Sequence, residues 1–143
     1  DKLPELRANS PIKIMADESC YNHHDARKLI NSGSVDYLNI KFSKSGGILE
    51  AQKIHEIALQ TGTKCMIGGM LESRIAITAN MHFALASPNV IFFDLDSCLL
   101  GHLVDPVTGG ITYNGYFVDI PDTPGIGADV DPKFLKTCEK WIV

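Results

Sequence analysis

Residues 36–62, DYLNIKFSKSGGILEAQKIHEIALQTG, contain one complete unit of strand followed by helix. YLNIK at 37–41 predicts a strand, because its apolar side chains alternate with polar ones. The apolar spacing within 48–60 predicts a helix, and Thr61-Gly62 is a typical signal for its C-terminal end. Repetition of this unit decides the fold class.

Further strand–helix units occur on both sides of this one. The predicted strands are IKIMA (12–16), YLNIK (37–41), KCMI (64–67) and VIFF (90–93), whose starts are roughly 25 residues apart. Helices are predicted around 25–31, 48–60 and 73–86, and residues 3–9 look like the tail of an earlier helix. This alternation implies an α/β fold with a parallel sheet and right-handed crossovers.

The regular period lacks a nucleotide-binding glycine fingerprint after the first strand, which favours a (β/α)8 barrel over a doubly wound sheet. Because only four units are present, residues 1–104 are predicted to be the second, C-terminal half of a barrel. Residues 105–143 form a separate return segment, expected to pack on a capping domain outside this chain. Its expected elements are a hairpin at 111–117 that turns at Asn114-Gly115, a loop at 121–132 and a short helix around 133–141.

Composition narrows the class of protein. The net charge is −4, and 45% of the residues are hydrophobic and 21% charged. This weakly acidic composition does not indicate binding to nucleic acid or to an anionic membrane surface. No apolar run is long enough to span a bilayer. The four cysteines form no C-x-x-C pair and are expected to be free thiols in a reducing cytoplasm. The first residues do not form a signal peptide and lack Met, so we expect a piece of a longer protein.

Ionisable residues or glycines follow every predicted strand. In chain order these are Asp17-Glu18, Lys41, Gly68-Gly69-Met70 with Glu72, and the pair Asp94 and Asp96. In a (β/α)8 barrel the catalytic groups sit at the carboxyl ends of the strands, so these side chains are expected to share one mouth.

Strand parity indicates which side chains face the barrel interior. Leu38 and Ile40 share one face of their strand, which should meet the helices, so Asn39 and Lys41 point inward. By the same rule Phe92, Asp94 and Asp96 point inward, and the alternate residues of that segment face the helices; these are Ile91, Phe93 and Leu95.

Each candidate also has a purely structural interpretation. Asp17 and Glu18 could cap the next helix, and Lys41 could be a solvated strand end. The two aspartates could start a loop, although their apolar neighbours oppose this, and Glu72 could be a first-turn acid. Lys44 could touch an anion or simply lie in a loop.

The segments PIKIMADES (11–19), DYLNIKFSKSGGI (36–48), MIGGMLES (66–73) and FFDLDSCLL (92–100) resemble the last four barrel strands of the enolase superfamily. PGIGADVD (124–131) is similar to that family's C-terminal return segment. The closest resemblance is to the muconate-lactonizing subgroup. Within it, the D-x-D at Asp94 and Asp96 resembles the motif of dipeptide epimerases such as L-Ala-D/L-Glu epimerase.

The resemblance implies a role for each of these residues. Asp17 matches one of three carboxylate ligands of a Mg2+ ion, and Lys41 matches an acid/base lysine that also contacts substrate. Asp94 and Asp96 match the pair that holds the α-ammonium of a dipeptide. Gly69 and Met70 match a segment that lines the substrate site. Residues that could support these groups are Glu18, Asn39 and Glu72.

The implied reaction moves a proton at the α-carbon of the C-terminal residue of a dipeptide. That proton is very weakly acidic, and a divalent cation bound by hard oxygen ligands such as Asp17 would stabilise the charge that develops. A lysine beside the cation is expected to have a depressed pKa and so to accept the proton. Inversion requires a second base on the opposite face.

Several parts of the family pattern are absent from the chain: the K-x-K lysines of an earlier strand, two metal-binding carboxylates and the capping domain. The expected partners are therefore the missing N-terminal part and the dipeptide, with a homo-oligomer left open and no nucleic acid or membrane. We expect the chain alone to be inactive. The alternatives are a muconate cycloisomerase or o-succinylbenzoate synthase-like enzyme, whose substrates carry no ammonium, and a non-catalytic half-barrel.

Overall fold

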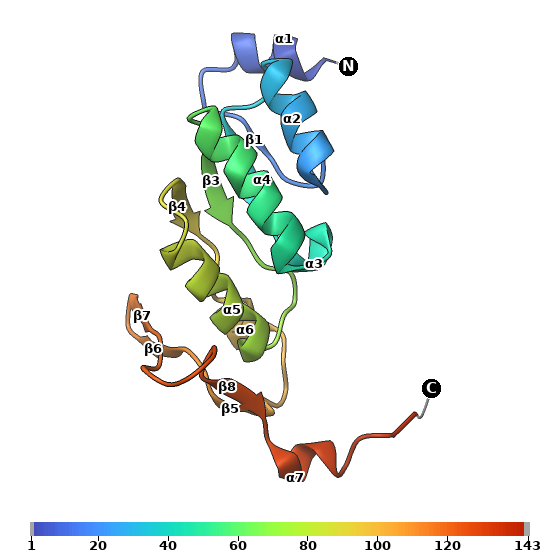
Figure 1. Cartoon of the computed structure of the whole chain (residues 1–143), viewed down its shortest axis with the longest axis vertical. Coiled ribbons are helices and arrows are strands. Elements are labelled where there is room, and N and C mark those ends of the chain that lie inside the picture. The colour runs from blue at the N-terminus through green and yellow to red at the C-terminus, as the bar shows by residue number, and fades with distance from the viewer. Residues whose placement is uncertain (1, 142–143) are drawn as a thin grey trace.

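The computed structural model describes residues 2–141 and contains one four-stranded parallel sheet. Its strands lie in chain order: β1 (Met15–Ala16), β2 (Tyr37–Ile40), β3 (Lys64–Ile67) and β4 (Val90–Phe93). The crossover helices α2 (His23–Asn31), α4 (Ile48–Gln60) and α5 (Arg74–Leu85) lie side by side over one face of the sheet (Figure 1). This arrangement confirms the prediction of an α/β half-barrel.

The apolar core lies between the sheet and these helices. Leu38 and Ile40 on β2 and Ile67 on β3 are buried against Ile54 of α4. Complete burial of an aliphatic side chain of this size is worth about 1.5–3 kcal/mol. The opposite face of the sheet carries Asn39 and Met66, as strand parity predicted for Asn39.

The first strand is shorter than predicted, because the Asp36 side chain binds the backbone at its amino end. The Asp36 carboxylate accepts from the N–H of Ile14 at 2.9 Å and pairs with Arg7 at 3.0 Å and Lys13 at 3.2 Å. The N–H of Ile14, together with these two cations, lowers the pKa of Asp36 to about 2. Helix α1 (Leu3–Asn9) is thereby held at the amino ends of the strands.

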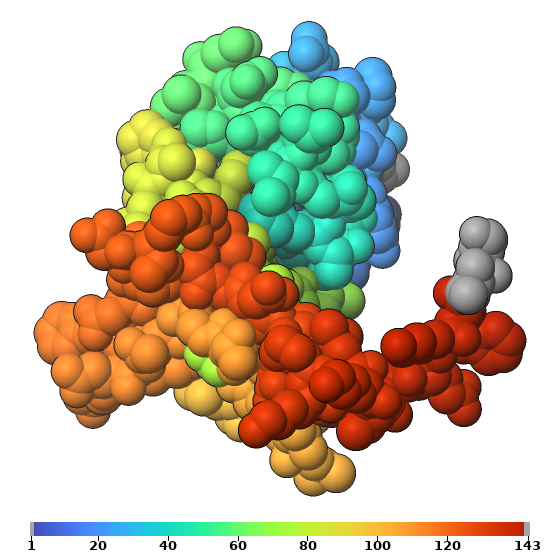
Figure 2. Space-filling model, turned by 60° about the horizontal axis from the view of Figure 1, so that its bottom comes forward, coloured from blue at the N-terminus to red at the C-terminus, as the bar shows by residue number. Residues whose placement is uncertain are grey.

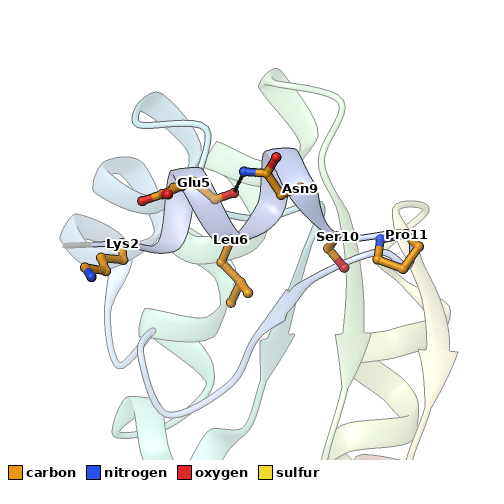
Figure 3. A pocket seen from close by; sticks show the side chains of 6 residues that line it. All are labelled: Lys2, Glu5, Leu6, Asn9, Ser10 and Pro11. Atoms are coloured by element: carbon orange, nitrogen blue, oxygen red, sulfur yellow. Dashed lines mark hydrogen bonds between the residues drawn. The ribbon is translucent and has the colours of Figure 1, made fainter.

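A shallow hollow beside α1 is lined by Lys2, Glu5, Leu6, Asn9, Ser10 and Pro11 (Figure 3). Within it, the side-chain amide of Asn9 donates to the carbonyl of Glu5 at 2.9 Å. The hollow lies at the end of the sheet opposite the predicted mouth and holds none of the candidate site residues.

A register shift in β4 corrects one part of the parity prediction. Val90 pairs with Cys65, but Phe92 and Phe93 pair with Met66 and Ile67, so Ile91 falls in the irregularity. Ile91 and Phe93 are 43% and 54% exposed, so the prediction that the helices cover these two side chains is wrong. Phe92 packs edge-on against Tyr37 with ring centroids 5.2 Å apart, which places it on the inner face as predicted.

The return segment contains more strands than predicted. β5 (Val107–Gly109) pairs with β8 (Ala128–Val130), which lies inside the stretch predicted to be a loop. β6 (Thr112–Asn114) and β7 (Phe117–Asp119) form the predicted hairpin. Because Asn114 pairs with Phe117, the two turn residues are Gly115 and Tyr116, and Gly115 takes a positive φ of 61°.

Three short helices complete the fold: α3 (Phe42–Ser45), α6 (Ser97–Leu100) and α7 (Pro132–Leu135). The predicted helix at 133–141 is wrong beyond Leu135. Residues 136–141 are exposed, and an isolated short helix without a packed apolar face is not stable. In Figure 2 this tail projects away from the remainder of the chain. Among residues 2–141, no helix has the length and apolar character needed to cross a membrane.

Arg74, the first residue of α5, fastens the return segment to the half-barrel. Its guanidinium donates to the Asp105 carboxylate at 2.6 Å, to the Val107 carbonyl at 2.5 Å and also to the Gly109 carbonyl. One turn later, Thr78 accepts from the N–H of Ile111 at 3.0 Å. The division at residue 104 stays a prediction, since these contacts join the two parts closely.

Candidate functional site

Two lysines, one directly after β2 and one in α3, converge on the aspartate that directly follows β1. Lys41 Nζ lies 2.9 Å from Asp17 Oδ2, and Lys44 Nζ lies 2.9 Å from Asp17 Oδ1. Parallel strands place their carboxyl ends at one edge, which explains why residues 24 positions apart meet here. Both cations lower the pKa of Asp17, against an opposing effect of burial.

The Lys44 ammonium has a full set of acceptors. In addition to the carboxylate, it donates to the carbonyls of Asp17 at 2.6 Å and Asn39 at 2.9 Å. An ammonium has three protons, and all three are used. With a side chain only 2% exposed, Lys44 is a structural clamp between the ends of β1 and β2.

Lys41 is held more loosely. Apart from Asp17, it lies 3.4 Å from Glu18 Oε1 and 3.9 Å from Met70 Sδ. Burial disfavours its charge, but the hydrogen bonds and attraction to Asp17 and Glu18 outweigh burial and raise its pKa. The depressed pKa expected for Lys41 beside a bound cation stays a prediction, because Asp17 here faces the lysine itself.

Asn39 lies on the inner face, as predicted, in close contact with Gly68. A Cβ on Gly68 would lie 2.4 Å from Asn39 Oδ1, so a larger residue there would displace the Asn39 side chain. Asn39 Oδ1 is buried and accepts no hydrogen bond within residues 2–141. It is thus an acceptor available to a group supplied from outside the described part of the chain.

Glu72 is buried and does not serve merely as a first-turn acid. Its carboxylate accepts from Ser43 at 2.8 Å and from the Asn80 amide at 3.1 Å. The N–H of Met70 points to the same carboxylate at 3.4 Å. Glu72 therefore supports the loop that carries Gly69 and Met70 after β3.

Gly69 lies next to the loop that follows β4. A Cβ at this position would approach Ser97 Oγ at 3.1 Å and the backbone oxygen of Asp94 at 3.6 Å. The ends of β3 and β4 are therefore in close contact, while Met70 is exposed and reaches toward Lys41. These contacts connect the four strand ends along one edge.

Asp94 and Asp96 directly follow β4, with Asp94 half-buried and Asp96 exposed. Neither carboxylate forms an ion pair with another residue in the range 2–141. They border a hollow of about 710 Å³, whose other lining residues include Met66, Leu99, Tyr113 and Val118. Two neighbouring anions beside apolar walls suit a ligand that carries a cation.

The donor set for Mg2+ is only partly present. Asp17 supplies a hard carboxylate that is 35% exposed, and Glu18 lies beside it. Residues 2–141 hold no group of three or more His, Cys, Asp or Glu side chains arranged to bind a metal ion. The carboxylate of Asp17 therefore fits as one ligand of such an ion.

Residues 1–134 match the family described as Enolase C-terminal domain-like. The chain belongs to this family. The match covers the whole half-barrel, including the strand-end site, and most of the return segment.

Similar proteins narrow the resemblance within the family. The D-Ala-D/L-Ala epimerase of Cytophaga hutchinsonii is 42% identical over 139 residues, which are 96% of this chain and 38% of that protein. The L-Ala-D/L-Glu epimerase of Bacillus subtilis is 42% identical over 125 residues, or 87% of this chain and 34% of that protein. The chain thus spans little more than a third of the length of these relatives.

A solved structure is similar to this chain in both backbone and sequence. The dipeptide epimerase of Cytophaga hutchinsonii, complexed with Mg and the dipeptide D-Ala-L-Val, matches with a TM-score of 0.92 and 41% identity. The match covers 96% of this chain and 38% of that one. The half-barrel and return segment of this enolase-family chain therefore have the backbone arrangement of a dipeptide epimerase.

Two contacts of the site could not be read from the sequence. The sequence leaves Lys44 open between an anion contact and a loop, since nothing local shows that its acceptors are Asp17, after β1, and Asn39, on β2. Tyr113 belongs to the hairpin, yet its hydroxyl donates to the carbonyl of Leu95, between the two aspartates. Both contacts depend on tertiary packing, which no local pattern encodes.

Loss of the Lys44 clamp should destabilise the fold measurably. We expect Lys44→Met in the intact protein to lower the free energy of unfolding by about 2–4 kcal/mol, because two carbonyls and a carboxylate lose a charged donor. Lys13→Met is the control. The Lys13 side chain is 69% exposed, so its loss should lower the free energy of unfolding by no more than about 1 kcal/mol. Urea denaturation measures both, and equal midpoints would refute the clamp.

Proposed function

We propose that this chain is part of a Mg2+-dependent dipeptide epimerase, which transfers a proton at the α-carbon of the C-terminal residue of a dipeptide. The remainder of the enzyme would supply the opposite base, two more carboxylates and the capping domain on which the return segment packs. The chain's own contribution is half of the barrel and one half of the proton-transfer machinery.

The observation that carries the proposal is the contact between Lys41 and Asp17, 2.9 Å apart at the ends of β1 and β2. It supports the proposal because Lys41, to which we assign the proton transfer, lies beside the carboxylate that we assign to Mg2+. When bound, Mg2+ supplies positive charge that offsets the negative charge developing on the substrate carboxylate. Asp17 would hold the ion, and Lys44 keeps Asp17 in place without occupying the position of Lys41.

Lys41 is suited to release Asp17 and act on substrate. Its ammonium forms one ion pair with Asp17, a longer contact with exposed Glu18 and a contact with the thioether of Met70. It is therefore not fixed by a full set of acceptors. We assign Lys41 Nζ the removal and return of the α-proton on one face of the substrate. Gly69 and Met70 form the neighbouring wall.

The aspartate pair selects the substrate class. Asp94 and Asp96 are free of cationic partners within residues 2–141, and an α-ammonium provides the charge that they lack. Cycloisomerase and o-succinylbenzoate synthase substrates carry no such cation, so this pair would have no role in those reactions. Relatives named for different dipeptides, D-Ala-D/L-Ala and L-Ala-D/L-Glu, leave the side chains of the substrate undetermined.

A cytoplasmic location remains a prediction. Cys20, Cys65, Cys98 and Cys138 are free thiols in the structure. Burial raises the pKa of Cys20 to about 11 and that of Cys65 to about 12, so both behave as inert core residues. Free thiols are typical of a reducing compartment.

The experiment compares the intact protein with the 143-residue chain. Each is incubated with Mg2+ and a panel of L,L-dipeptides, and formation of the epimer is followed by chiral chromatography. We expect the intact protein to epimerise at least one dipeptide and the chain alone to epimerise none, because the opposite base is missing.

The isolated chain should also bind hydrophobic dyes. β1 and β4 are unpaired edges, and Phe92 and Phe93 on β4 are 39% and 54% exposed. An intact protein that leaves every dipeptide unchanged would refute the proposed function. Robust epimerisation by the chain alone would refute the division of the site between two parts.

A further inference from the structure

The hydroxyl of Tyr113 contacts the loop that carries the two candidate ammonium ligands. Tyr113 lies on β6 of the return segment, and its Oη donates to the carbonyl of Leu95, between Asp94 and Asp96. Cys98 Sγ, in α6, lies 3.0 Å from the same oxygen and can donate to it. One phenol thus joins the hairpin, the aspartate loop and α6.

In the loop formed by Asp94, Leu95 and Asp96, a backbone group of each residue forms a hydrogen bond with a different element. The N–H of Asp94 donates to a β3 carbonyl at 3.0 Å, and the carbonyl of Asp96 accepts from an N–H of α6 at 2.8 Å. The Leu95 carbonyl, between them, depends on Tyr113. Leu95 itself is buried in the core, so its carbonyl cannot readily turn to water instead.

The surroundings keep the phenol in its donating form. Burial raises the pKa of Tyr113, and the hydrogen bond with Cys98 and the negative charge of Asp96 act in the same direction. The ring also packs against the apolar core, together with Val118 of β7. A fixed phenol that keeps its proton is a directional hydrogen-bond donor.

We infer that Tyr113 is a positioning residue for substrate binding: by fixing the Leu95 carbonyl, it sets the separation and direction of the Asp94 and Asp96 carboxylates that receive the substrate's α-ammonium. The inference rests on the proposed function and deepens it. It gives the return segment a part in substrate recognition, separate from its packing on a capping domain.

The test uses Tyr113→Phe in the intact protein, which removes one oxygen and leaves the ring in place. The matched control is Thr112→Val, which also removes one hydroxyl while keeping the shape of the side chain, at an exposed position of the same strand. Two measurements are made on each variant. One is kcat and KM for Ala-Glu and for its N-acetylated form, and the other is amide hydrogen exchange of residues 92–100 by mass spectrometry.

Tyr113→Phe should raise KM for free Ala-Glu by roughly 2- to 10-fold, the range that the net contribution of one hydrogen bond allows, while kcat changes little. The acetylated substrate should be unaffected, and exchange in residues 92–100 should accelerate. Thr112→Val should alter neither property. Unchanged exchange and KM in Tyr113→Phe, or equal losses for both substrates, would overturn the inference.

The two proposals fail in different ways. If the wild-type protein epimerises no dipeptide, the proposed function is wrong, and amide exchange still decides whether Tyr113 fixes the loop. If the wild-type protein is active but Tyr113→Phe behaves like Thr112→Val, the positioning role is wrong and the epimerase assignment stands.

Discussion

Lys41→Ala in the intact protein should abolish dipeptide epimerisation while leaving the protein folded. Loss of a general base typically costs about 10²–10⁴-fold in rate, and here no second amine can replace it. Lys44 is the nearest one, but its three protons are committed to Asp17 and Asn39. The measurement is the initial rate of epimer formation, with the circular dichroism spectrum as the check on folding.

Lys41→Arg separates proton transfer from charge. Arginine retains a cation beside Asp17 but does not deprotonate at any pH at which the protein folds, so it should be as inactive as alanine. Lys53→Ala, at an exposed lysine of α4, is the control and should retain full activity. If Lys41→Arg kept near-normal turnover, Lys41 would be an electrostatic residue and the assigned base would lie elsewhere.

Asp94→Asn and Asp96→Asn should each lower kcat/KM for a free dipeptide by roughly 10- to 150-fold. This is the cost of about 1.5–3 kcal/mol for losing a charge-assisted hydrogen bond to the ammonium. The loss should be much smaller for the N-acetylated dipeptide, which has no ammonium and should already be a poor substrate. Steady-state kinetics with the two substrates measure the difference.

A purely structural role for the two aspartates makes the opposite prediction. If they only hold the loop, both substrates should lose activity in equal proportion, and the melting temperature should fall. Asp122→Asn, an exposed residue of the return segment, controls for the change in net charge. Equal losses with destabilisation would remove the ammonium site from the proposed function.

The half-barrel was predictable because its units are locally encoded. β3, β4, α1 and α4 have the predicted bounds, since apolar periodicity and terminal signals mark them directly. Parity correctly placed Asn39 on the inner face and Leu95 in the core. The parity rule failed for Ile91, because a register shift relative to β3 interrupts the alternation of side chains.

The return segment was less predictable, because its strands are short and their partners are distant in sequence. Ala128–Val130 becomes a strand only through Val107–Gly109, and the local glycines and prolines indicate a loop. The expected last helix does not continue through residues 136–141, because these residues are exposed and pack on no other part of the described range 2–141. The contacts of Lys44 and Tyr113 are tertiary in the same sense.

The most direct test of the epimerase proposal is α-proton exchange catalysed by the intact protein in D2O with Mg2+. Proton NMR follows L-Ala-L-Glu, a hydrophobic dipeptide and D-Ala-L-Val in parallel, with the Lys41→Arg variant as the blank. The proposal predicts that at least one dipeptide loses the α-proton signal of its C-terminal residue, while its N-terminal α-proton persists and the blank shows no epimer. Retention of both α-protons in every dipeptide, or exchange confined to the N-terminal residue, would contradict it.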